Sequence, residues 1–254
     1  STGAQLTAIG AQALYNNTTA DYNVAVGYNA LLTNTTGTQN TAVGSFALED
    51  TTTASYNTAT GYNSLRNNTT GANNTAFGYS ALQDSTTADN NTAVGYNALV
   101  TNTTGASNTA VGAHALDANT EGTLNTAVGR ECLTANTTGD KNSALGKGAL
   151  GSNTTADNNT AMGFDALVNN TTGTQNTAVG SLSLDANTTA DNNTAFGYVS
   201  LSANSTGTQN TAVGADALKS NTTANNNTGI GFAALKLNTT GTANVAVGYN
   251  SLIN

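Results

Sequence analysis

Apolar and polar residues follow one another along this chain with a fixed period of seventeen residues. The segment 23–31 (NVAVGYNAL) returns seventeen residues later as 40–48 (NTAVGSFAL). The first copy, at Leu6, is degenerate, and further copies start at Asn23, at Asn40 and at every seventeenth residue up to Asn244, fifteen in all. A fixed short period of this kind predicts a repeat architecture.

The residue types at each place in the repeat are strongly restricted. Numbered from the Asn of Asn-Thr-Ala-Val-Gly, position one is Asn in fourteen copies, position three is Ala in fourteen, and positions five and nine are Gly and Leu in all fifteen. Position eight is always small, and positions twelve to fourteen are Asn-Thr-Thr in most copies. A disordered low-complexity chain would not keep the same residue types at a fixed spacing. We therefore expect a folded chain in which equivalent residues of every copy pack in the same way.

The period and the residue types together predict an all-β fold. Seventeen residues are too few for the helix pairs of common α-solenoids, which need about 33 to 47, and Asn, Thr and Gly are poor helix formers. Asn-Thr-Thr-Gly favours a turn, Thr-Ala-Val-Gly favours a strand, and a second, shorter extended piece is expected around Ala-Leu. We therefore predict a parallel β-solenoid (β-roll) of about fifteen 17-residue coils, forming one domain over residues 1–254.

The leucine of position nine is the predicted core of each coil, and asparagines at positions one and twelve are expected to stack into amide ladders along the solenoid. The core residues are Leu14, Leu31, Leu48, Leu65, Leu82, Leu99, Leu116, Leu133, Leu150, Leu167, Leu184, Leu201, Leu218, Leu235 and Leu252.

Position four is apolar in every copy except at Thr60, and two placements of it are open. If Ala at position three faces inward with the leucine, strand alternation turns position four outward, and the resulting apolar stripe would need cover from another chain. In the alternative, position four fills the coil and the chain is a monomeric rod. We favour an interchain stripe, formed by Val26, Val43, Phe77, Val94, Val111, Val128, Leu145, Met162, Val179, Phe196, Val213, Ile230 and Val247.

A longer period overlies the first. Position fifteen alternates between Gly and Ala over most of the chain and loses this rhythm at Gly122 and Gly139. The alternation indicates a duplicated unit of 34 residues. We interpret the irregular copies near residues 121–147 as drift in a redundant array.

The phrase Asn-Thr-Ala-Val-Gly-Tyr-Asn-Ala-Leu with its Asn-Thr-Thr-Gly turn resembles repeat regions of phage tail-fibre proteins and of trimeric autotransporter adhesins. Adhesin heads carry a shorter repeat around a Ser-Val-Ala-Ile-Gly phrase, which residues 142–146 (NSALG) approach. The resemblance covers all fifteen copies. It implies a homotrimer of left-handed parallel β-rolls in an extracellular fibre on a virion or a cell surface.

Charge and hydropathy exclude several partners. The net charge is −8 with only six Lys and Arg residues, so nucleic-acid binding and attraction to an anionic membrane are not expected. No apolar run approaches the roughly 18 residues of a membrane span. Because Ser1 and Asn254 fall at positions thirteen and eleven without polar caps, we expect a window of a longer fibre or an end-to-end filament unit.

The sequence offers no catalytic, metal or cofactor site. His114 is the only histidine, and the single Cys132 occupies the small position eight, so we expect a surface and a buried structural role respectively. The aspartates that share position sixteen on alternate or more distant coils are too far apart for one calcium ion. These aspartates are Asp21, Asp89, Asp157 and Asp191. A polysaccharide depolymerase would need carboxylates clustered in a groove, and the glutamates Glu49, Glu121 and Glu131 are too scattered along the chain for that.

Two binding interpretations remain for the repeat. Tyr62, Tyr79 and Tyr96 share position six and could contact a cell-surface glycan, although ring packing within or between chains is favoured. The Asn-Thr-Thr triplets match the N-glycosylation pattern, and a turn explains them more simply.

We therefore expect a non-enzymatic structural or adhesive rod of an extracellular fibre, which spaces or presents a receptor-binding end and self-associates as a homotrimer or end to end. The alternative is an ice-binding β-solenoid, which would use ranked threonines. The paired threonines of positions thirteen and fourteen fit that role poorly, since neighbours on a strand point to opposite sides.

Overall fold

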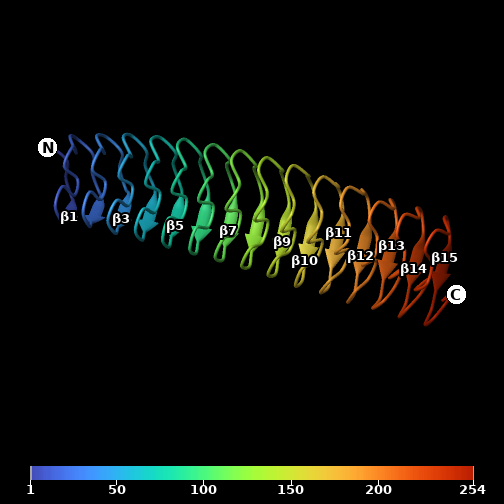
Figure 1. The fold of residues 1–254 in the computed structure, drawn as a ribbon. Coiled ribbons are helices and arrows are strands. Elements are labelled where there is room, and N and C mark those ends of the chain that lie inside the picture. The colour runs from blue at the N-terminus through green and yellow to red at the C-terminus, as the bar shows by residue number, and fades with distance from the viewer. Residues whose placement is uncertain (1, 254) are drawn as a thin grey trace. The chain divides into compact units, whose positions relative to one another are not determined.

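The computed structural model describes residues 2–253 of the chain. It divides into two compact units, Ser1–Asn125 and Thr126–Asn254. Each unit consists of stacked coils that carry one three-residue strand apiece, and the described residues contain no helix (Figure 1). The predicted all-β solenoid with seventeen-residue coils is thus confirmed.

The strands all lie at positions two to four of the repeat. In the first unit they are β1 (Thr7–Ile9), β2 (Val24–Val26), β3 (Thr41–Val43), β4 (Thr58–Thr60), β5 (Thr75–Phe77), β6 (Thr92–Val94) and β7 (Thr109–Val111). In the second unit they are β8 (Thr126–Val128), β9 (Ser143–Leu145), β10 (Thr160–Met162), β11 (Thr177–Val179), β12 (Thr194–Phe196), β13 (Thr211–Val213), β14 (Thr228–Ile230) and β15 (Val245–Val247).

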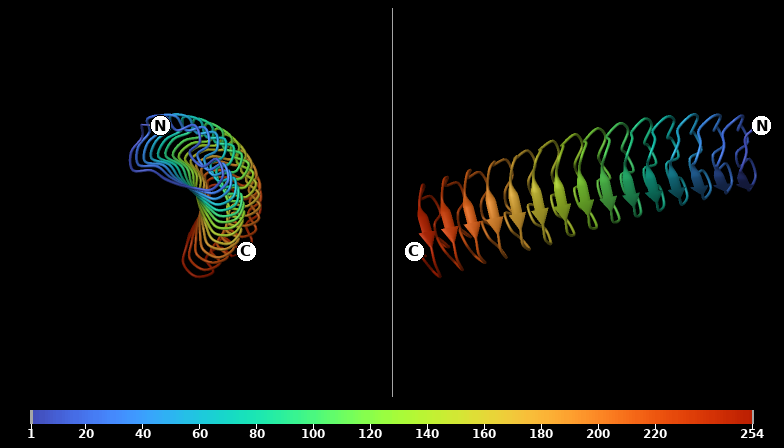
Figure 2. Two further views of the ribbon diagram at one scale, coloured as in Figure 1. Left: turned by 90° about the vertical axis from the view of Figure 1, so that its left-hand side faces the viewer. Right: turned by 180° about the vertical axis from the view of Figure 1, so that it is seen from behind.

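Within each unit the strands pair in parallel with equivalent residues side by side, as Ala42 with Ala59 in the first and Ala161 with Ala178 in the second. The view from behind in Figure 2 shows one arrow per coil, with the remainder of each coil in turns. The second extended piece predicted around Ala-Leu is wrong. These residues form a turn, because the leucine backbone is left-handed rather than extended.

The leucines of position nine fill the coils, as predicted. All of those from Leu31 to Leu218 are fully buried, and Leu14 and Leu235 are nearly so. Leu252 corrects the prediction, because it lies in the last coil, has no described coil stacked beyond it, and is 57% exposed. Small residues at positions three and eight are buried beside the leucines in most coils, as Ala42 and Ala47 are beside Leu48.

The backbone of the core leucine is unusual. Leu48 has a φ of 52°, and its equivalents in every other coil also have positive φ. A left-handed conformation costs a residue with a Cβ roughly 1–2 kcal/mol. Full burial of a leucine side chain contributes about 1.5–3 kcal/mol, so burial offsets the strain and the inward turn is retained.

The asparagine of position one is buried and bonds in two directions. The Asn40 side chain donates through Nδ2 to the Ala54 carbonyl of its own coil at 2.8 Å, and its Oδ1 accepts the backbone N–H of Asn57 in the next coil at 2.9 Å. The column therefore differs from the predicted ladder of side-chain amides. Each Nδ2 group already donates to a carbonyl of its own coil. The Oδ1 atom therefore accepts a backbone N–H of the next coil instead of a side-chain amide.

The predicted amide ladder is present at position twelve. In the second unit Asn187 donates to Asn170 Oδ1 at 2.8 Å, and the same bond recurs from Asn153 to Asn238. In the first unit Thr51 and Ser85 replace asparagine in the ladder. Their hydroxyls and the Oδ1 atoms of the preceding asparagines are buried without a hydrogen-bond partner. The ladder is thus broken twice in the first unit.

The 34-residue period has a structural cause. Where position fifteen is alanine, position sixteen carries a short polar side chain that accepts a backbone N–H from the preceding coil, as Asp89 Oδ1 accepts from Ala72 at 2.7 Å. That preceding coil has glycine at position fifteen, Gly71, because a Cβ there would collide with the Ala88 carbonyl. Two consecutive coils therefore form one hydrogen-bonded unit.

The interpretation of residues 1–254 as one domain stays a prediction, since the chain separates into two compact units. Ser1 and Asn254, on which the expectation about the chain ends was based, lie outside the described residues.

The broken ladder yields a stability prediction for Ser85→Asn. The new Nδ2 can donate to Asn68 Oδ1 and to the Ala88 carbonyl, as Asn119 Nδ2 donates to Asn102 Oδ1 at 2.8 Å and to the Gly122 carbonyl at 3.0 Å. Satisfying a buried polar group contributes on the order of 1 kcal/mol, so we expect a higher urea midpoint by circular dichroism.

The reciprocal control is Asn187→Ser in the intact ladder, which removes bonds of 2.8 Å to Asn170 and 3.0 Å to Ala190. We expect its midpoint to fall. A lower midpoint for Ser85→Asn would contradict this account of the ladder.

Candidate interaction surface

The outward sides of the strands form a continuous surface in each unit, which we call the strand face. It consists of the side chains at positions two and four. The middle residue of nearly every strand is buried while its two neighbours are half-buried or exposed. The two phenylalanines of the face, Phe77 and Phe196, are 59% and 55% exposed.

This arrangement decides between the two placements of position four. The stripe of Val26, Phe77 and their equivalents points away from the coil interior, and the alternative with position four inside is wrong. Strand alternation explains the result, because alanine at position three takes the inward place beside the leucine. Whether another chain covers the stripe stays a prediction.

A row of threonines lies beside the stripe on the same face. Position two is Thr in twelve copies, and these residues are half-buried or exposed. Sequence reasoning considered threonines only at positions thirteen and fourteen. Most of those at position thirteen are half-buried and donate to the equivalent carbonyl of the next coil, as Thr69 does to Thr86 at 2.9 Å.

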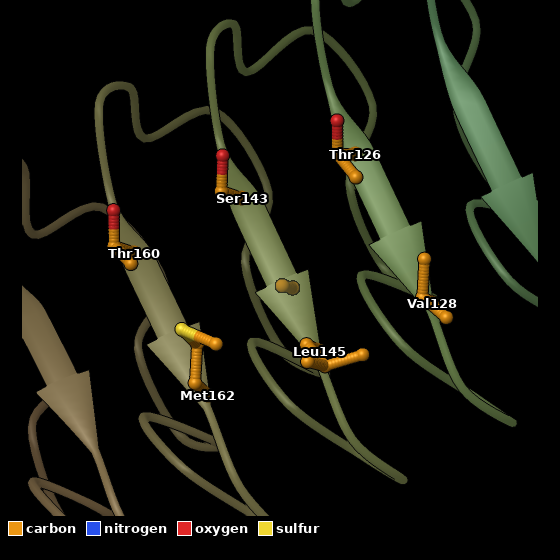
Figure 3. A pocket seen from close by; sticks show the side chains of 7 residues that line it. Thr126, Val128, Ser143, Leu145, Thr160 and Met162 are labelled. Atoms are coloured by element: carbon orange, nitrogen blue, oxygen red, sulfur yellow. The ribbon is translucent and has the colours of Figure 1, made fainter.

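A shallow hollow interrupts the strand face of the second unit. It measures about 210 Å³ and lies over β8, β9 and β10. Figure 3 shows Leu145 and Met162 on one side and the shorter Ser143 on the other. Serine lacks the methyl group of threonine and so opens this notch. The lining is almost wholly apolar and contains no charged side chain.

A row of rings follows the first unit at the corner beyond the glycine of position five. We call it the aromatic ladder, and it consists of Tyr28, Phe46, Tyr62, Tyr79, Tyr96 and His114. Neighbouring ring centroids are 5.3–5.6 Å apart. Sequence reasoning missed Phe46 and His114, because they occupy position seven rather than position six.

The three tyrosines predicted to contact a glycan lie in the middle of this ladder. Tyr62 and Tyr79 are stacked with an interplanar angle of 16°, and Tyr79 and Tyr96 with one of 17°. Their faces are therefore turned toward each other rather than toward solvent. Sugar rings pack against exposed faces of aromatic rings, so this geometry favours a role of the tyrosines in packing against one another. Contact with a glycan stays a prediction.

Glu49 is a buried carboxylate close to the aromatic ladder. Glu49 accepts from Asn29 Nδ2 at 2.8 Å and pairs with Arg66 at 2.7 Å, while the Arg66 guanidinium lies 5.0 Å from the Phe46 ring centroid. Burial, with the Glu49 charge beside it, raises the pKa of Asp50 despite the opposing effect of Arg66. Glu49 is thus satisfied structurally, which leaves it unsuited to general acid or base chemistry.

Other carboxylates also have structural partners or are isolated. Glu131 pairs with Arg130 at 2.7 Å, and Glu121 is exposed. The Lys236 and Lys219 side chains hydrogen-bond to Asp216 and lower the pKa of its carboxyl. The glutamates form no catalytic arrangement within either described unit.

The residues considered for metal binding are structural as well. Asp21, Asp89, Asp157 and Asp191 each accept a backbone N–H of the preceding coil. Among residues 2–253 no three His, Cys, Asp or Glu side chains come close enough to hold a metal ion. His114 is partly buried rather than fully exposed, with Nδ1 3.0 Å from Asp117 Oδ2.

In the Asn-Thr-Thr triplets, the asparagine that would accept an N-linked glycan is buried. Asn34, Asn102 and most of their equivalents are fully buried, and the Nδ2 atoms of Asn34 and Asn102 donate to the carbonyl of position fifteen at 2.9 Å. A glycan on that nitrogen is incompatible with the stacked coil. The turn explanation of the triplet is therefore favoured by the structure.

Comparison with known proteins adds no identification. The chain matches no protein-family model, and no curated protein is significantly similar to it. Within residues 2–253 there is no helix with the length and apolar character required to cross a membrane.

Cys132 provides a test of coil burial. Its side chain is fully buried, and burial raises the pKa of the thiol to about 12. The thiolate is the reactive form, so we expect no labelling by a maleimide at pH 8 in the native protein and full labelling after denaturation. Rapid native labelling would show that the coil around Cys132 opens readily.

Proposed function

We propose that this chain is a non-enzymatic structural rod of an extracellular fibre, in which copies of the chain cover one another's strand face. The observation that carries the proposal is the apolar stripe itself. A soluble monomer rarely leaves a contiguous apolar strip of this extent in contact with water. The structure supports a covered stripe because the strand alternation exposes it coil after coil.

The coil interior supports a structural rather than a chemical role. Leucine, alanine and asparagine fill the coils, and backbone hydrogen bonds join each coil to the next, as from Leu65 to Ala81 at 3.0 Å and from Leu201 to Ala217 at 2.9 Å. This leaves the surface as the place where partners act. The low content of charged residues, 8%, also suits a face that is buried between chains.

The resemblance to tail-fibre and adhesin repeats favours a homotrimer as the assembled state. In a parallel assembly about an axis along the coils, identical side chains of position four meet at the same level. The stripe then forms a shared apolar core, while the opposite turns, with Thr87 and its exposed equivalents, face solvent. Attachment to a cell-surface glycan at one end of such a fibre is a further part of the proposal.

The assembly is tested with a pair of charged substitutions, one in each unit. Phe77→Asp with Phe196→Asp places carboxylates on the strand face, where burial of an unpaired charge costs about 3–5 kcal/mol per site. We expect the wild type to show a multiple of the 25.3 kDa chain mass by light scattering, three for the homotrimer. The double variant should fall to the monomer mass with an unchanged circular dichroism spectrum.

The matched control carries the same charges on the exposed turn. Thr87→Asp with Thr189→Asp should keep the wild-type mass. A wild type that is monomeric at all accessible concentrations would remove the covered-stripe proposal.

The threonine row of position two favours a second candidate, an ice-binding surface. Equivalent threonines on adjacent strands repeat at about 4.8 Å, a regular spacing that can order water. The uneven side chains of position four, from Val94 to Phe77, make the face less flat than such a surface requires. This keeps the fibre role first.

Thermal hysteresis measured near freezing separates the two functions. We expect none from the assembled protein, since its strand face is covered. Hysteresis in the wild type that is lost in Thr92→Tyr and retained in Thr87→Tyr would assign the face to ice instead.

A further inference from the structure

The three central rings of the aromatic ladder are all tyrosines on successive coils. Tyr62, Tyr79 and Tyr96 are 44%, 48% and 51% exposed, and each neighbouring pair has ring centroids 5.4 Å apart. About half of each of these residues is therefore accessible to a small oxidant in solution. Each of these pairs joins two phenols, whereas the rings that Tyr28 and Tyr249 contact are phenylalanines.

The backbone holds the three rings in this arrangement. The Tyr62 carbonyl accepts the N–H of Ser80 at 2.9 Å, and the Tyr79 carbonyl accepts the N–H of Asn97 at 3.0 Å. These bonds fix the ring-bearing positions of consecutive coils beside each other. The half-exposed rings can still turn about χ2, a broad torsion in tyrosine. Two phenols are thus kept together at high effective concentration.

We propose that Tyr62, Tyr79 and Tyr96 are a site of oxidative cross-linking, in which adjacent coils become joined by dityrosine. The co-reactant is hydrogen peroxide, used by a haem peroxidase. Each phenol gives up one electron and its hydroxyl proton, and two phenoxyl radicals join through a carbon–carbon bond between ring positions ortho to oxygen.

The coupled rings then regain aromaticity as each ortho hydrogen moves to the oxygen. In total two tyrosines lose two electrons and two protons, and one hydrogen peroxide accepts them and yields two waters. The product is a covalent link between residues seventeen apart, Tyr62 to Tyr79 or Tyr79 to Tyr96. Such a link restricts the unfolded chain in the manner of a disulfide and staples neighbouring coils together.

The chain contains internal controls for this chemistry. Tyr28 packs against Phe46, and Tyr249 stacks on Phe232 at 5.4 Å and 14°, so each has a ring neighbour that lacks a phenol. Position six on either side of Tyr198 is Ser181 and Ala215. These three tyrosines are at least as exposed as Tyr79 and should remain unlinked.

The experiment treats the full chain with hydrogen peroxide and a haem peroxidase, then digests it with trypsin. Cleavage after Arg66 and Arg130 places Tyr62 in peptide 1–66 and the other two tyrosines in peptide 67–130. A link from Tyr62 to Tyr79 joins these peptides, whereas a link from Tyr79 to Tyr96 lowers the mass of peptide 67–130 by two hydrogens. We expect both products, with dityrosine fluorescence.

Two variants make the assignment specific. Tyr79→Phe keeps the stacked ring and removes the shared phenol, so we expect loss of both products and of the fluorescence. Tyr198→Phe should match the wild type. Cross-links spread over all nine tyrosines, links only between separate chains, or no loss in Tyr79→Phe would each overturn the proposal.

Discussion

The buried amide of position one is the constraint on which the stack depends. Its Nδ2 closes the coil by donating to the carbonyl of position fifteen, and its Oδ1 fixes the register by accepting the N–H of the next coil, as with Asn91 and Asn108. A three-residue strand alone is too short to hold a register. Because the same side chain serves both purposes, the coil and the stack form together.

This dense interior directs function to the surface. Most coils bury the leucine, the small residues and two asparagines, and the side chains that vary between copies lie outside the coil interior, including those on the strand face and at the corner with the aromatic ladder. The sizes at position four and the rings at position six therefore differ between copies without disturbing the coil. A repeat that is uniform inside can carry a non-uniform outer surface.

The core and the strand could be predicted because both depend on periodicity. The invariant leucine and the alternation around alanine at position three determine which side chains enter the coil, and no tertiary information is needed for that step. Propensity misled the prediction at the leucine turn. Left-handed backbone is associated with Gly and Asn, so nothing in the sequence indicates positive φ at Leu48.

Other features depend on three-dimensional partners. Asp89 resembled a calcium ligand by residue type, yet its oxygen accepts a backbone N–H from a residue seventeen positions away. The orientation of Tyr79 follows from the rings above and below it, and Phe46 joins them from a different repeat position. The strand-face hollow at Ser143 results from one missing methyl group. Composition and spacing do not determine such contacts.

The two gaps in the position-twelve ladder give the chain a mechanical polarity. Both lie in the first unit, at Thr51 and Ser85, whereas the ladder is asparagine throughout the second unit. When the stack is pulled along its axis, neighbouring coils should separate first at these gaps. Separation should stop where the asparagine ladder of position twelve is complete. The first unit would then yield as an extensible segment, and the second would keep its length.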